Sequence, residues 1–239
     1  MSANLALAEL KAFGKKSRIS DLARFYKTSP GEYAEGDLFF GGSVPQTRSV
    51  ASNHKGLSFE ELDKLFKSPF HEARLCAAII LNLQFKVAKS LEARKKIFEF
   101  YLKQVKAERI NNWDIVDVSA PWMGVYLIEV DDPMPLLIKL AKSKSLWQRR
   151  VSIILTLALI RAGDLAPTII ISELLLKDKE DLIHKAVGWM LRELGKRDVM
   201  LLRGFLKEHS HEMPRTMLRY AIERLPEKER KKWLLESKS

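Results

Sequence analysis

Apolar residues recur along most of this chain at spacings of three and four, which places them on one face of an α-helix. Segment 70–88 shows the pattern clearly, with apolar side chains at these positions: Leu75, Ala78, Ile79, Leu83 and Val87. Most of the 11 glycines and 9 prolines fall at the ends of such segments and not between alternating, strand-like runs. The pattern predicts an all-α protein.

Boundary residues support many of these helices. Ser58 and Glu61 have the spacing of a capping box, in which each side chain bonds the backbone amide of the other residue. Gly163 and Gly195 are expected to end two helices, and Pro45, after a glycine pair, to begin one. The predicted helices span residues 58–67, 70–88, 90–105, 113–130, 133–142, 145–162, 166–177, 181–194, 198–208, 214–225 and 226–235.

Pairs of these helices recur at roughly 35–45 residues, the period of HEAT and armadillo repeats. Each pair is amphipathic and would bury its apolar face only by stacking on its neighbours. The pairs show little sequence similarity to one another, so an irregular helical bundle remains an alternative to a helical-repeat solenoid. Because no Ser/Gly-rich linker divides the chain, we expect one domain over residues 1–239, less regular over 1–57.

The charge of the chain narrows the classes of partner. With 41 Lys and Arg against 30 Asp and Glu, the formal net charge is +11. Such an excess favours polyanionic partners, with nucleic acid first and an anionic membrane surface second. At 46% hydrophobic residues, the chain also has enough apolar material for a sizeable core.

Cysteine usage and hydropathy indicate the compartment. Cys76 is the one cysteine, which excludes an intramolecular disulfide and a Cys-ligated zinc site. Glu9 and Lys11 interrupt the amino-terminal segment where a secretory signal would need an apolar run. The longest apolar run, 151–160, is shorter than the ~18–20 residues that span a bilayer. We therefore expect a cytoplasmic protein without a membrane segment.

Several catalytic chemistries lack their motifs in this sequence. It contains no Walker loop, no Gly-rich dinucleotide fingerprint, no Gly-x-Ser-x-Gly elbow and no His-Glu-x-x-His pair. His209 and His211 are two residues apart, which points them to different faces of a helix. His71 and His184 are expected to be solvated surface residues. We therefore expect neither a metal site nor a cofactor.

Tryptophans beside charged residues are the unusual feature of the chain. Three sets have the three- or four-residue spacing that shares a helix face: Trp113 with Asp117, Trp147 with Arg150, and Trp189 with Lys185 and Arg192. Core packing is the ordinary role of a single tryptophan. Their combination with charges instead favours a surface that grips a sugar-phosphate chain, with aromatic planes, cations for phosphate and a carboxylate.

These motifs resemble the AlkD family, the alkylpurine-DNA glycosylases built from HEAT-like repeats. The matching segments are residues 113–117 (WDIVD), Pro121, residues 146–150 (LWQRR) and residues 183–193 (IHKAVGWMLRE), in the family's order and spacing. A weaker likeness extends back to Phe40-Gly41 and Pro45. The resemblance implies a helical-repeat solenoid whose concave, basic face binds DNA.

The resemblance also assigns roles to individual residues. It places the catalytic carboxylate at Asp117, the two sugar-contacting tryptophans at Trp113 and Trp189, and an arginine at Arg150. Residues expected to add DNA contacts are Arg149, Lys185, Arg192, Ser43 and Arg48. An upstream tyrosine of the family is matched only approximately, by Tyr33.

The chemistry of alkylated purines suits these residues. A purine alkylated at N3 or N7 is cationic and leaves as a neutral base, so no strong general acid is needed. The developing oxocarbenium ion on the deoxyribose is stabilised by a fixed carboxylate, the role expected for Asp117. We therefore expect a monomeric, monofunctional glycosylase that removes 3-methyladenine and 7-methylguanine from double-stranded DNA.

Two other functions remain open at this point. One is a catalytically silent HEAT-repeat protein that binds damaged or branched DNA, against which the presence of Asp117 and both tryptophans argues. The other is a solenoid whose basic surface binds an acidic protein. The salt dependence of DNA binding would separate the second from any DNA-binding function.

Overall fold

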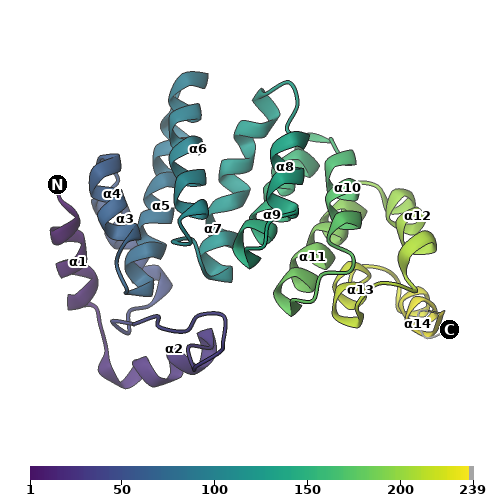
Figure 1. Ribbon diagram of the computed structural model, residues 1–239, viewed down its shortest axis with the longest axis horizontal. Coiled ribbons are helices and arrows are strands. Elements are labelled where there is room, and N and C mark those ends of the chain that lie inside the picture. The colour runs from purple at the N-terminus through teal and green to yellow at the C-terminus, as the bar shows by residue number, and fades with distance from the viewer. Residues whose placement is uncertain (237–239) are drawn as a thin grey trace. The chain divides into compact units, whose positions relative to one another are not determined.

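The computed structural model describes residues 1–236, and within that range every regular element is helical. The all-α fold predicted from the sequence is therefore confirmed. The chain divides into two compact units, Met1–Met123 and Gly124–Ser239, whose α-helices are labelled in Figure 1. Among the described helices, none is both long and apolar enough to cross a membrane.

In the first unit, helix α5 forms the centre of the core. The helices of this unit are α1 (Ala3–Ala12), η1 (Lys16–Arg18, a 3₁₀-helix), α2 (Ile19–Tyr26), α3 (Val44–Asn53), α4 (Phe59–Phe66), α5 (His71–Val87), α6 (Leu91–Lys106) and α7 (Trp113–Met123). Helix α5 contacts α1, α3, α4, α6 and α7. It is buried around most of its circumference, including its polar residues His71, Glu72 and Arg74, because several helices pack against it.

In the second unit, α9 and α11 form the core. The helices of this unit are η2 (Gly124–Glu129, a 3₁₀-helix), α8 (Met134–Ala141), α9 (Leu146–Ala162), α10 (Ala166–Leu174), α11 (Asp181–Arg197), α12 (Val199–His209), α13 (Arg215–Ala221) and α14 (Glu227–Glu236). Helix α9 contacts η2, α8, α10 and α11, and α11 contacts α10, α12 and α13. Each helix thus packs mainly on its near neighbours in the sequence, as in helical-repeat folds.

Between α2 and α3 the chain has no regular helix but is tied to the start of α5. Leu38 forms an isolated parallel β-bridge with Phe70, the residue that precedes α5. The carboxylate of Glu72 accepts hydrogen bonds from the three successive backbone amides of residues 40–42, at 2.9–3.2 Å. The glycine pair before Pro45 is therefore held by Glu72 of α5, while the rest of segment 1–57 carries helices α1, α2 and α3.

Several predicted boundaries are confirmed. Gly163 ends α9 in the left-handed conformation, with φ +94°. Pro45 lies in the first turn of α3, where its missing N–H costs no helical hydrogen bond.

Four predicted helix ends are wrong, and two of them, expected at residues 177 and 225, lie at Leu174 and Ala221. Helix α11 continues past Gly195, where a Cβ atom would lie 2.5 Å from the side chain of Leu202 in α12. This glycine therefore lets two helices approach closely and does not end one. The α-helix expected over 113–130 ends at Met123 and continues as η2, shortly after Pro121, which has no N–H for the helical ladder.

The capping box expected at Ser58 forms only in part. The Ser58 hydroxyl accepts from the amide of Glu61 at 3.4 Å, but the Glu61 carboxylate accepts from the amide of Ala3 at 2.6 Å. The first amides of α1 have no partner inside their own helix, so Glu61 satisfies one of them. A complete box is present at the start of α3, between Ser43 and Gln46.

Candidate functional site

The two residues that the sequence singles out on α7 share its partly exposed face. Trp113 opens the helix and Asp117 lies one turn later, and both side chains are half-buried. The opposite face of α7 is buried: Ile115, Val116, Ser119 and Ala120. The buried side chain of Asn112 accepts from the backbone amide of Trp113 at 2.8 Å and fixes the start of the helix.

Aromatic residues of α2 surround the indole of Trp113. The Tyr26 ring stacks on it with a centroid distance of 5.9 Å, and Phe25 meets it edge-on, also at 5.9 Å. Tyr26 stacks in turn on Phe39, at 5.5 Å. The tyrosine beside Trp113 is therefore Tyr26, whereas Tyr33, which the resemblance suggests, lies in the segment after α2.

Asp114, next to Trp113, is the hub of a buried polar network that the sequence does not reveal. Its Oδ2 atom accepts from the Tyr26 hydroxyl and from Nε2 of His71, each at 2.9 Å. Nδ1 of His71 lies 3.4 Å from a carboxylate oxygen of Asp37, which also pairs with Arg74 at 2.6 Å. The network joins α2, α5 and α7.

The expectation that His71 is solvated is wrong, because only 2% of its side chain is exposed. Its ring packs against Tyr26 and Phe39, with centroid distances of 4.4 Å and 5.3 Å. These aromatic rings cover the first turn of α5, so His71 is buried although its side chain is polar.

The charges of this network are balanced. Burial lowers the pKa of His71, but the carboxylates of Asp114 and Asp37 outweigh burial and raise it to about 9. His71 is therefore an imidazolium at neutral pH and donates to both carboxylates. Burial and the Asp114 carboxylate raise the pKa of Tyr26 well above its usual value, so its hydroxyl remains a donor.

In the second unit, Arg150 and Trp147 of α9 are both buried, with exposed fractions of 4% and 5%. The Arg150 guanidinium donates to the backbone carbonyl of Leu182 in α11. His184, also expected to be solvated, is half-buried and donates through Nε2 to the carbonyl of Asp178 at 2.6 Å. This part of α9 is therefore packed closely on α11.

Arg149, the neighbouring residue, binds two loops of the second unit together. Its Nε atom lies 2.6 Å from a carboxylate oxygen of Asp178, and its NH1 atom donates to the carbonyls of Ser143 and Lys144. The guanidinium thus has protein partners on several sides. The DNA contact expected for Arg149 stays a prediction.

Trp189, Lys185 and Arg192 share the half-buried face of α11. The two cations that flank the indole in the sequence have carboxylate partners: Lys185 pairs with Asp181 at 2.7 Å, and Arg192 pairs with Glu223 of the segment after α13. The predicted DNA contacts of both cations also remain predictions.

Ser43 and Arg48 both belong to the start of α3. Ser43 is the N-cap, and its hydroxyl and amide both donate to the side-chain oxygen of Gln46 at 2.8 Å. Arg48 is exposed in the second turn. The Ser43 side chain therefore stabilises the helix, whatever else it binds.

The candidate residues divide between the units. The first unit holds Trp113 and Asp117 on α7, with Tyr26 stacked on Trp113, and the second holds Arg150 and Trp189 on α9 and α11. Within residues 1–236, no group of three or more His, Cys, Asp and Glu side chains could hold a metal ion.

Comparisons with known proteins give the family. The model of the family described as DNA alkylation repair enzyme matches residues 6–225. No curated protein matches the chain significantly. A solved structure, "Predicted DNA alkylation repair enzyme from Enterococcus faecalis", has a TM-score of 0.66 at 16% identity and is similar over 90% of this chain and 97% of that one. At this identity the structural likeness shows the fold, whereas the family model covers most of the sequence. The chain belongs to the family of DNA alkylation repair enzymes.

Proposed function

We propose that this protein is a monofunctional DNA glycosylase that removes purines alkylated at N3 or N7 from duplex DNA and leaves an abasic site. Membership of the DNA alkylation repair family supports alkylated DNA as the substrate. The observation that carries the proposal is the position of Asp117 one turn from Trp113 on the half-buried face of α7.

The leaving base determines what the protein must supply. An alkyl group at N3 or N7 makes the purine cationic, so the base departs as a neutral molecule with the electrons of the glycosidic bond. Protonation of the base is therefore unnecessary. The deoxyribose becomes an oxocarbenium ion, which the Asp117 carboxylate stabilises electrostatically. The same carboxylate orients the water that adds to C1′, and the proton of that water passes to the carboxylate or to solvent.

The tryptophans contact the sugar in this mechanism. An indole face is rich in electrons and favours a developing cation by roughly 0.5–2 kcal/mol. Contacts with Tyr26 and Phe25 hold the Trp113 ring in a defined orientation. Trp189 has the same proposed role, and Arg150 binds a phosphate beside the lesion. Lys185 and Arg192 add contacts to the DNA backbone, and no cofactor takes part.

Replacing Asp117 by Asn tests the proposal, because the substitution keeps the shape of the side chain and removes its charge. Base excision should fall at least about a hundredfold, while DNA affinity changes little. The measurement is single-turnover release of 7-methylguanine from a duplex, with affinity measured by mobility shift. Asp164→Asn, the same change at an exposed position, is the matched control and should retain full activity.

Excision by Asp117→Asn at nearly the wild-type rate would remove Asp117 from the mechanism. The products of the wild-type reaction test the reaction class separately. Free methylated base and an intact strand with an abasic site are expected. Transfer of the methyl group to the protein, or strand cleavage without added alkali, would contradict a monofunctional glycosylase.

A further inference from the structure

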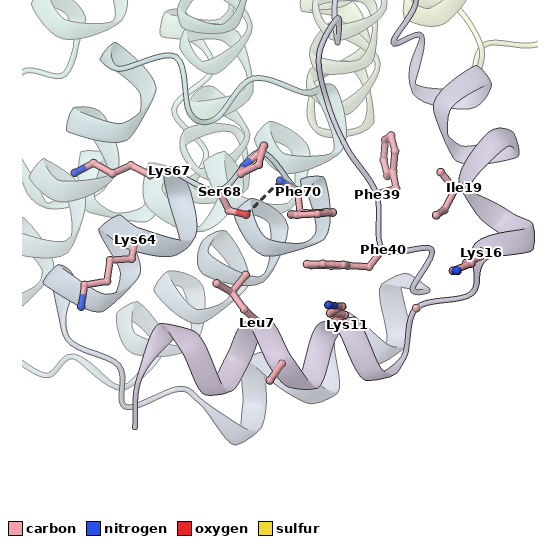
Figure 2. A pocket seen from close by; sticks show the side chains of 13 residues that line it. Leu7, Lys11, Lys16, Ile19, Phe39, Phe40, Lys64, Lys67, Ser68 and Phe70 are labelled. Atoms are coloured by element: carbon pink, nitrogen blue, oxygen red, sulfur yellow. Dashed lines mark hydrogen bonds between the residues drawn. The ribbon is translucent and has the colours of Figure 1, made fainter.

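The first unit contains a cavity of about 690 Å³ that none of the candidate site residues lines, although its lining residue Phe39 also stacks on Tyr26. Figure 2 shows it between α1, the segment from η1 to the start of α2, the extended residues Phe39 and Phe40, and the turn that leads into α5. Its size falls within the range of about 300–1,000 Å³ that is usual for ligand sites.

Apolar side chains form the walls of this cavity. The rings of Phe40 and Phe70 stack in parallel, with centroids 3.9 Å apart and an interplanar angle of 6°. Leu7 of α1, Ile19 and Phe39 complete the apolar lining. Figure 2 shows Leu7 pointing from α1 toward the stacked pair.

The walls are held in place before any ligand binds. The backbone amide of Phe40 donates to the Glu72 carboxylate at 3.1 Å. A Cβ atom at Gly14 would lie 2.5 Å from the Phe40 carbonyl oxygen, so α1 ends directly against this segment. A preformed site loses little conformational entropy on binding, which favours affinity.

Lysines surround the apolar walls. Among the described residues that line the cavity, four are lysines, namely Lys11, Lys16, Lys64 and Lys67, and none is acidic. Lys64 and Lys67 pair with carboxylates of α4 outside the cavity but remain 61% and 58% exposed. Lys11 and Lys16 are exposed and have no carboxylate partner in the part of the chain that the structure describes.

The geometry points to a binding site for a short acidic peptide segment of a partner protein. One aromatic or branched aliphatic side chain of that segment would enter between Leu7, Phe40 and Phe70. Its carboxylates would meet the exposed ammonium groups of Lys11 and Lys16. A buried apolar anchor surrounded by complementary charge is the usual form of such an interface.

Two other classes of ligand fit the cavity less well. Small polar ligands are oriented by fixed polar groups inside the site, but the hydroxyl of Ser68 already accepts from the Phe70 amide at 3.2 Å. Single-stranded nucleic acid binds along a track of successive aromatic platforms and cations. Here the lysines surround a single apolar cavity.

The first test uses fluorescence anisotropy with the full-length protein and a short labelled peptide, in which several Asp residues precede a C-terminal Phe. One control peptide replaces the Phe by Ala, and the other replaces the Asp residues by Asn. Each control should bind at least about tenfold more weakly. Equal binding of all three peptides would overturn the proposal.

Variants of the protein locate the binding. The double substitution Lys11→Glu with Lys16→Glu should weaken peptide binding at least about tenfold, and so should Leu7→Gln. The matched control is Lys89→Glu with Lys95→Glu, which reverses two exposed lysines of the same unit outside the cavity. Thermal unfolding verifies that every variant is folded. If Leu7→Gln unfolds, the lysine variants alone decide the result.

Several other results would overturn the proposed peptide site or assign the cavity to another ligand. No binding of any peptide, or equal affinity of both lysine double variants, would overturn the inference. Direct binding of a labelled single-stranded oligonucleotide more tightly than the peptide, weakened by Lys11→Glu with Lys16→Glu but not by Lys89→Glu with Lys95→Glu, would assign the cavity to nucleic acid. Binding of phenylpropionate as tightly as the peptide would assign it to small anionic molecules.

Discussion

Two carboxylates on one turn of α7 have different surroundings. The Asp114 side chain is 13% exposed and accepts from Tyr26 and His71. It therefore positions Trp113 and the aromatic residues beside it. Asp117 lies on the same side of the helix at its half-buried surface. Of the two, Asp117 is the carboxylate that we propose for chemistry on a bound sugar.

The charge state of His71 predicts how stability depends on pH. The pKa of His71 rises from its ordinary 6.5 to about 9 in the folded protein, so the folded state holds its proton more tightly than the unfolded state. The resulting stabilisation, about 3 kcal/mol, is complete below about pH 6.5 and is lost as the pH rises through 9. Urea unfolding at a series of pH values measures it.

The variant His71→Gln isolates this contribution. Its free energy of unfolding should vary less between pH 6.5 and 9.5 than that of the wild type, while His211→Gln, at a histidine that is 60% exposed, should follow the wild type. Parallel curves for His71→Gln and the wild type would show that His71 is not protonated in the folded state.

Substitutions of Arg149 and Arg150, adjacent residues of α9, should differ in their effect on base excision. Arg149→Ala leaves the carboxylate of Asp178, 7% exposed, without its strongest partner, and should lower the free energy of unfolding by about 3 kcal/mol. Arg150→Ala removes a buried side chain that donates to the Leu182 carbonyl and should therefore also destabilise the protein. In the folded variant it should lower base excision at least about tenfold through a lost phosphate contact. The excision rates of both variants are measured at a temperature at which each variant is folded.

The double variant Arg149→Ala with Asp178→Asn should recover part of the lost stability, because the unpaired buried charge is then removed. If Arg149→Ala reduces excision by the folded protein as much as Arg150→Ala does, Arg149 contacts the DNA and the assignment of the two residues is wrong.

Local sequence signals predict that a helix is present better than they predict the residues at which it begins and ends. The periodicity of segment 70–88 predicts α5 because burial of its apolar positions is the main source of its stability. The role of Gly195 depends on Leu202 of the next helix, and local patterns do not contain that contact. For the same reason, local patterns do not reveal that His71 is buried.

Glycines at helix contacts give a test at this scale. A Cβ atom at Gly188 of α11 would lie 2.5 Å from the Met217 carbonyl oxygen of α13, whereas one at Gly204 of α12 would meet nothing within 4 Å. Gly188→Ala should therefore destabilise the protein by about 1–3 kcal/mol. Gly204→Ala should stabilise it by up to about 1 kcal/mol, because alanine favours helices. Equal changes in the unfolding temperature for Gly188→Ala and Gly204→Ala would contradict this account of the contact between α11 and α13.

For the whole molecule, the sequence predicts the fold class, which the structure confirms, and names part of the candidate site. Trp113 and Asp117 are found by their four-residue spacing, since one helix determines both positions. Tyr26 and His71 meet Asp114 across 88 and 43 residues of sequence, and only the tertiary fold brings them there. The net charge of +11 agrees with a nucleic-acid partner, but it does not identify the reaction.

The most direct test of the proposed reaction is base release from a panel of duplex oligonucleotides at one enzyme concentration. The panel contains 7-methylguanine, a bulky N7 adduct, hypoxanthine and uracil. If Asp117 stabilises the sugar cation and the base supplies its own charge, both cationic adducts are released, and hypoxanthine and uracil are not. Efficient release of hypoxanthine or uracil would contradict this mechanism, and so would failure to release 7-methylguanine.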